Sequence, residues 1–90
     1  MSDKFIDWEP RARDELRQWQ KENKKMAERI FELLKDIQIQ PYTGIGKPEA
    51  LKYGLTGWWS RRIDPINRLV YTVTDDSIII MSCRYHYKKR

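Results

Sequence analysis

The stretch NRLVYTVTDDSIIIMSCRYHY, residues 67–87, decides the fold because it contains two strand-like segments separated by a short polar turn. β-Branched and aromatic residues dominate residues 67–74 and 77–87, and such residues favour extended strands. Two consecutive aspartates interrupt the apolar pattern between these segments, as turn residues do. A similar segment, WWSRRI at residues 58–63, comes shortly before. We therefore expect an antiparallel meander of three to four strands in the C-terminal half.

Two amphipathic helices are expected before this meander. Pro10 suits the first turn of a helix, and the apolar positions after it have helical spacing, at Ala12, Leu16 and Trp19. Asn23 is a suitable N-cap for a second helix, whose apolar stripe consists of Met26, Ile30, Leu33, Leu34 and Ile37. A short strand at residues 4–8 opens the chain. This order of elements predicts an α+β fold with both helices packed on one face of the sheet.

Length and composition exclude several classes of protein. The 90 residues suffice for one domain, residues 1–90. Cys83 has no second cysteine to pair with, and a single histidine offers no metal-ligand spacing, so we expect neither a metal nor another cofactor. No apolar run approaches the ~20 residues of a membrane span, and the N-terminus lacks the apolar segment of a signal peptide. We expect a soluble protein of the cytoplasm.

The net charge of +5 belongs entirely to the second part of the chain. Residues 1–40 contain nine basic and nine acidic side chains, whereas residues 41–90 contain nine basic and four acidic ones. Tyrosines and tryptophans are interleaved with these basic residues. This combination favours binding to a nucleic acid, although a solvated basic surface is the alternative on composition alone.

The hairpin of residues 67–87 brings polar residues together. A three-residue turn at residues 75–77 pairs Arg68 with Arg84, one step from His86 on the same face, whereas a two-residue turn pairs Arg68 with Cys83. Asp-Asp is a poor two-residue hairpin turn. We therefore expect Arg68, Arg84 and His86 to form a cluster on one sheet face.

Such a cluster suits RNA cleavage. Guanidinium groups bind phosphate, and an imidazole with a pKa near 6.5 transfers protons at cellular pH. One group must take the 2′-OH proton and another must protonate the departing 5′-oxygen. A mechanism with two histidines is excluded because His86 is the single histidine. Glu49, in the loop between Lys47 and Lys52, is the best remaining candidate for the base.

The motifs GKPEALKYGLTGWWSRRI and NRLVYTVTDDSIIIMSCRYHY resemble those of the YoeB/Txe-type toxins of the RelE superfamily, and the similarity extends from Lys4 to Tyr87. The resemblance implies a RelE-like fold and ribosome-dependent, metal-independent cleavage of mRNA in the ribosomal A site. It also implies a cognate antitoxin of the YefM/Axe type as partner, beside the ribosome and mRNA. A homodimer is a further expectation.

The resemblance also implies roles for individual residues. The catalytic base of the family corresponds to Glu49, its transition-state arginine to Arg68 and its general acid to His86, while Tyr87 matches a tyrosine that positions the substrate. The expected RNA-binding set consists of Lys47, Lys52, Arg61, Arg62 and Arg84.

Two departures from the family pattern and three alternatives accompany this interpretation. The family usually has histidine where this chain has Asn67, and residues 88–90 extend beyond the usual terminal tyrosine. Arg61 and Arg62 have the alternative role of coating an exposed strand. A toxin of the ParE type, which binds DNA gyrase without RNA chemistry, is the alternative function, and a non-enzymatic repressor is weaker because no recognition-helix pattern is present.

Overall fold

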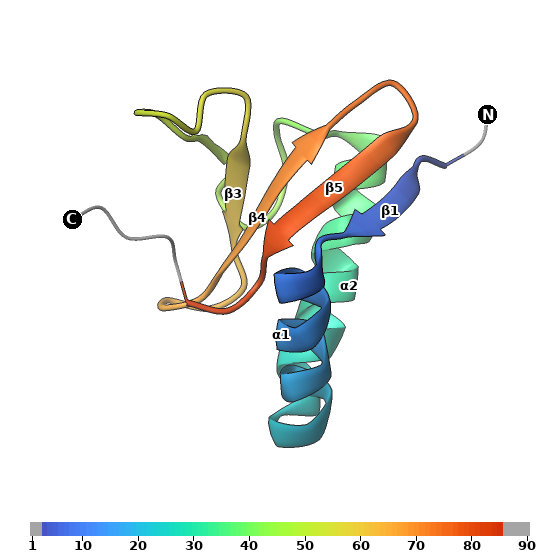
Figure 1. Cartoon of the computed structure of the whole chain (residues 1–90), viewed down its shortest axis with the longest axis vertical. Coiled ribbons are helices and arrows are strands. Elements are labelled where there is room, and N and C mark those ends of the chain that lie inside the picture. Colours follow the sequence, from blue (N-terminus) through green and yellow to red (C-terminus); the bar gives the residue numbers. More distant parts are fainter. Residues whose placement is uncertain (1–2, 86–90) are drawn as a thin grey trace.

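The computed structural model describes residues 3–85 of the chain (Figure 1). Strand β1 (Phe5–Trp8) is followed by two helices, α1 (Pro10–Glu22) and α2 (Lys24–Ile39). The other strands are β2 (Glu49–Ala50), β3 (Trp59–Arg62), β4 (Arg68–Val73) and β5 (Ser77–Ser82). His86 and Tyr87, both predicted to be catalytic, lie outside the described residues.

The strands form one five-stranded sheet in the order β1-β5-β4-β3-β2. Strands β2 to β5 are antiparallel neighbours, as the meander prediction required. The opening strand joins the far edge, where β1 pairs with β5 in parallel. The α+β fold is therefore confirmed, with β2 as a short edge strand inside the segment that the sequence suggested was a loop.

Both helices pack on the same face of the sheet, as Figure 1 shows. The five apolar residues predicted for the second helix are all buried, whereas the α1 stripe buries Ala12 and Trp19 fully and Leu16 in part. They pack against the sheet residues Leu69, Tyr71, Ile78 and Ile80. Asn23 occupies the N-cap position of α2, but its side chain makes no capping hydrogen bond. Apolar packing therefore determines how the helices sit on the sheet.

The turn between β4 and β5 corrects the predicted hairpin register. The backbone N–H of Thr74 donates to the carbonyl of Ser77 over 2.8 Å, and Val73 pairs with Ile78, so the turn contains two residues and not three. The Thr74 hydroxyl accepts a hydrogen bond from the Ser77 N–H at 3.0 Å, which supports this turn. Side-chain capping of this kind makes an Asp-Asp turn acceptable.

A β-bulge then shifts the same pair of strands by one residue. Tyr71 pairs with Ile80 but Val70 pairs with Ser82, which leaves Met81 as the extra residue. Because a bulge exchanges the two faces of a strand beyond it, Cys83 joins Ile80 on the helix side. The regular alternation assumed from the sequence therefore fails beyond Ile80.

Candidate active site on the open face of the sheet

Strands β3 and β4 present different side chains on the two faces of the sheet. Leu69 and Tyr71 lie in the core on the helix side, so the residues that alternate with them point to the opposite side, which we call the open face. The register places Ser60 opposite Val70 and Arg62 opposite Arg68. The open face of β3 and β4 therefore carries Ser60, Arg62, Arg68 and Val70.

Arg68 and Glu49 meet on this open face. The Arg68 guanidinium donates from Nη1 to Glu49 Oε1 at 3.1 Å and to Ser60 Oγ at 3.2 Å. Glu49 lies on β2, opposite Ser60 in the strand register. The Arg68 side chain is 23% exposed and the Glu49 side chain 65% exposed. The fold thus brings together the predicted base and the predicted transition-state arginine, and leaves the carboxylate accessible to solvent.

Other basic residues surround this pair. Arg62 is exposed and is the direct cross-strand neighbour of Arg68. Like charges directly opposite each other on a sheet are destabilising, and Glu49 offsets this repulsion. Lys47 and Lys52 flank β2, and both are exposed. The arrangement has an excess of positive charge that a bound polyanion would neutralise.

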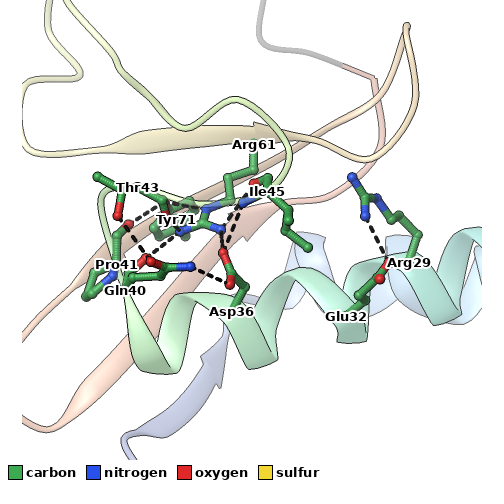
Figure 2. Close-up of polar contacts among 9 residues, drawn as sticks. All are labelled: Arg29, Glu32, Asp36, Gln40, Pro41, Thr43, Ile45, Arg61 and Tyr71. Carbon is green, nitrogen blue, oxygen red and sulfur yellow. Dashed lines mark hydrogen bonds and ion pairs between the residues drawn. The ribbon is translucent and has the colours of Figure 1, made fainter.

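The structure corrects the prediction for Arg61, which lies on the helix side and is fully buried. Figure 2 shows its side chain extending from β3 towards α2 and the loop that follows this helix. Its guanidinium donates to the Asp36 carboxylate, the Tyr71 hydroxyl and three backbone carbonyls, those of Gln40, Thr43 and Ile45. A guanidinium with no exposed surface cannot contact RNA, so Arg61 is a structural residue.

The reason for this burial is the loop between α2 and β2. Three carbonyls of residues 40–45 turn inward, and buried carbonyls need donors; the five N–H groups of arginine supply them. Hydrogen bonds from the Gln40 side chain and then from Arg61 hold the pKa of Asp36 below its ordinary value. Burial raises the pKa of Tyr71, whose hydroxyl donates to the Pro41 carbonyl at 2.7 Å. The charged pair of Arg61 and Asp36 therefore fastens this loop to β3.

The predicted cluster of Arg68 with Arg84 is wrong. Arg84 donates from Nη1 to Gln18 and from Nη2 to Glu22, both at 2.9 Å, and its guanidinium carbon lies 4.3 Å from the ring centre of Trp19. These partners belong to α1, on the other side of the sheet from Glu49. The β5 ladder ends at Ser82, so strand pairing no longer holds Arg84 on the open face. Hydrogen bonds to Glu22 and Tyr85 raise the pKa of Arg84.

The end of β5 is anchored by residues whose role sequence reasoning missed. Glu15 is buried on α1, and its Oε1 accepts the backbone N–H of Cys83 at 2.8 Å. The Trp19 indole donates to the Cys83 carbonyl at 2.9 Å. Burial raises the pKa of the Cys83 thiol to about 12, which makes it unreactive at neutral pH. A glutamate within the apolar stripe of a helix was the available signal for this anchor.

Residues 3–85 contain no group of three or more histidine, cysteine, aspartate or glutamate side chains that could hold a metal ion. Within the same part of the chain, neither helix is long and apolar enough to cross a membrane. The groups that the open face exposes to a ligand are the Glu49 carboxylate and the guanidinium groups of Arg62 and Arg68.

Comparison with known proteins identifies close relatives. Residues 8–87 match the family described as the YoeB-like toxin of bacterial type II toxin-antitoxin systems. The chain is 50% identical over 80 residues to Toxin YoeB of Escherichia coli strain K12, which covers 89% of this chain and 95% of that protein. The YoeB dimer from Staphylococcus aureus superposes with a TM-score of 0.91 at 48% identity, covering 96% of this chain and 100% of that one. The heterotetrameric YoeB-YefM toxin-antitoxin complex from the same organism gives a TM-score of 0.88 at 48% identity, with the same coverage.

Proposed function

The chain belongs to the YoeB-like toxins of bacterial type II toxin-antitoxin systems, and from this premise we propose that it is a ribosome-dependent endoribonuclease that cleaves mRNA in the ribosomal A site. The observation that carries the proposal is the contact between Glu49 and Arg68, which are 19 residues apart in the chain and meet on the open face. A solvent-accessible carboxylate beside a phosphate-binding group suits phosphodiester cleavage better than a binding-only role.

The proposed reaction begins with Glu49, which accepts the proton of the 2′-OH as the 2′-oxygen attacks phosphorus. Arg68 stabilises the negative charge that develops on the phosphoryl oxygens. His86 matches the position of the family's general acid, and it protonates the 5′-oxygen as the bond between phosphorus and that oxygen breaks. Tyr87 positions the substrate. The products are a 2′,3′-cyclic phosphate and a 5′-hydroxyl.

The contacts of Arg68 support this role. Within the described part of the chain, both of its side-chain hydrogen bonds come from Nη1. Arginine has five N–H donors, so donors on Nη2 and Nε remain for a phosphate. The neighbouring charge of Arg62 favours the same ligand, and Lys47 and Lys52 extend the positive surface along β2. We propose these three residues, without Arg61 and Arg84, as the RNA-contacting set.

The proposed partners follow from the family and from charge. Solved relatives include a YoeB dimer and a YoeB-YefM complex, both from S. aureus, and we propose the corresponding homodimer and antitoxin complex for this chain. An antitoxin segment that presents acidic side chains to Arg62 and Arg68 would suit the net charge of +5. Dependence on ribosomes places the activity in the cytoplasm. The relatives named for this chain are YoeB toxins, and none of these names indicates the gyrase binding of the alternative function.

The test is mRNA cleavage with and without ribosomes, measured in single-turnover experiments. We expect cleavage only with ribosomes, and we expect it to survive EDTA when ribosome integrity is verified separately. His86→Gln should lower the rate by ~10²–10⁴-fold, as loss of a proton-transfer group does. A 5′-phosphate on the downstream product would contradict attack by the 2′-OH. A control reaction with Arg84→Gln should retain cleavage, because Arg84 contacts α1.

A further inference from the structure

Asn67 connects the start of β4 with the end of the described chain. Its side chain is buried, with 6% of the residue exposed. The Nδ2 group donates to both carboxylate oxygens of Asp64, at 3.2 and 3.3 Å, and Oδ1 accepts a hydrogen bond from the backbone N–H of Tyr85. One amide thus uses its donor towards a turn and its acceptor towards a segment 18 residues away.

The backbone of Tyr85 is held on both sides by this end of β4. Besides the Asn67 contact, the Arg68 N–H donates to the Tyr85 carbonyl at 3.1 Å. Tyr85 has φ of +59°, a conformation that costs a non-glycine residue free energy. Local contacts must therefore maintain this conformation, and the hydrogen bonds of the Tyr85 backbone with Asn67 and Arg68 are suited to this role.

The regular β4–β5 ladder ends at Ser82, so continuous strand pairing does not hold this segment. Cys83 is fastened to α1 through Glu15 and Trp19. After Arg84 the backbone of Tyr85 lies beside the start of β4, where it forms hydrogen bonds with Asn67 and Arg68. Asn67 therefore holds the backbone of the residue that directly precedes His86 in the sequence.

We propose that Asn67 is a positioning residue that orients the segment carrying His86 and Tyr87 with respect to Arg68. The inference rests on the proposed function, in which His86 is the general acid. Asn67 does not touch the reacting atoms; it acts through the backbone of Tyr85. Asp64 contributes to this positioning, because its carboxylate accepts hydrogen bonds from the Asn67 amide group and so orients Oδ1 towards Tyr85.

The donors and acceptors of the replacement side chain determine whether the hydrogen bonds of Asn67 with Asp64 and Tyr85 are kept. Leucine has the same branched shape and is somewhat larger, but it has neither donor nor acceptor. Aspartate accepts from Tyr85 but cannot donate, and it places a second negative charge beside Asp64. A neutral imidazole offers one donor and one acceptor, as the amide does. We therefore expect Asn67→His, studied at pH 8, to replace the amide, and Asn67→Leu to abolish its action.

The experiment compares Asn67→Leu with a matched control, Thr74→Ala, which removes a side-chain contact from the turn at the other end of β4. Single-turnover cleavage is measured at saturating ribosome concentration, together with the affinity for ribosomes. Asn67→Leu should slow cleavage by about 10–100-fold, as a small misplacement of a catalytic group does, with affinity changed less than about twofold. Thr74→Ala should cleave at nearly the wild-type rate, and Asn67→His should recover most of the lost rate.

Two NMR measurements on the folded variants separate this inference from the proposed function. Asn67→Leu should increase the exchange rate of the Tyr85 amide and shift the His86 ring resonances, whereas Thr74→Ala should do neither. If the wild type failed to cleave mRNA, the proposed function would fall, while the NMR comparison would still decide the role of Asn67. Unchanged His86 resonances in Asn67→Leu, or wild-type cleavage after the Tyr85 amide loses protection, would overturn the inference.

Discussion

Two arginine-carboxylate pairs lie on opposite faces of the same sheet, and their surroundings give them different roles. Arg61 pairs with Asp36 on the helix side, where the two side chains are 0% and 16% exposed. Arg68 pairs with Glu49 on the open face, where the exposed fractions are 23% and 65%. Among residues 3–85, the first guanidinium has five protein acceptors, whereas the second has two.

The comparison shows that residue type and sequence neighbourhood do not decide what an arginine does. Arg61 and Arg62 are adjacent, yet Arg61 fastens a loop in the interior and Arg62 lies beside Arg68 on the open face. A buried ion pair makes its members hard to remove, whereas an exposed pair contributes little to stability and remains available for ligands.

Arg61→Met should lower the free energy of unfolding by ~3–5 kcal/mol, because it leaves the charge of Asp36 and several buried carbonyls without their donor. Urea denaturation followed by circular dichroism measures the loss. Arg62→Met is the matched control on the neighbouring residue and should change stability by less than about 0.5 kcal/mol. Equal losses of unfolding free energy in the two variants would contradict a structural role that belongs to Arg61 and not to Arg62.

Glu49→Gln should lower the single-turnover rate of mRNA cleavage by ~10²–10⁴-fold, equivalent to roughly 3–5 kcal/mol of activation free energy. Its unfolding free energy should change by less than about 0.5 kcal/mol, because Glu49 is largely exposed. The experiment combines ribosome-bound single-turnover kinetics with urea denaturation of the free protein. A variant that cleaved normally but bound ribosomes weakly would assign Glu49 to binding and not to proton transfer.

Acid should weaken the interior pair. Because the pKa of Asp36 is lower in the folded protein than its ordinary value of about 3.8, its contribution to stability is complete above that value and is lost as the pH falls through the folded pKa. Wild-type stability should therefore decline below about pH 3.8 partly through Asp36. Asp36→Asn should be less stable at pH 7 and should decline less steeply in acid, as thermal unfolding across this range would reveal. Parallel acid profiles for the two proteins would contradict this assignment.

The exposed pair of Arg68 and Glu49 should contribute the least to the free energy of unfolding. A double-mutant cycle on Glu49→Gln and Arg68→Gln should give a coupling free energy of about 0.2–1 kcal/mol in low salt. At 1 M salt, where the Debye length is ~3 Å, the coupling should largely disappear. Stability is measured by urea denaturation at both salt concentrations. A coupling above about 2 kcal/mol that persists in high salt would make the Arg68 pair structural, like that of Arg61.

The limits of sequence reasoning appear at the end of β5. Strict alternation placed Arg84 on the open face with Arg68, but the β5 ladder ends at Ser82, so the chain no longer follows the sheet at Arg84. The end of a strand has no firm signature in a single sequence, because it depends on which neighbouring element holds the residues that follow. Here α1 receives Cys83 and Arg84 through Glu15 and Glu22. The sequence singled out Glu49 and Arg68 separately, and the fold brings the two together, whereas it places Arg84 against α1 and not with Arg68.

The helix stripes, the strand segments and the family can be predicted from consecutive residues, because local periodicity and short motifs are properties of neighbouring positions in the chain. Which face of β3 is closed depends instead on where α2 and the loop at residues 40–46 pack, and this is visible only in the folded protein. Alternation separates Arg61 from Arg62 but does not reveal which of them meets inward-facing carbonyls. The different roles of Arg61 and Arg68 therefore arise from packing, since burial determines how many acceptors surround each guanidinium and whether a ligand can reach it.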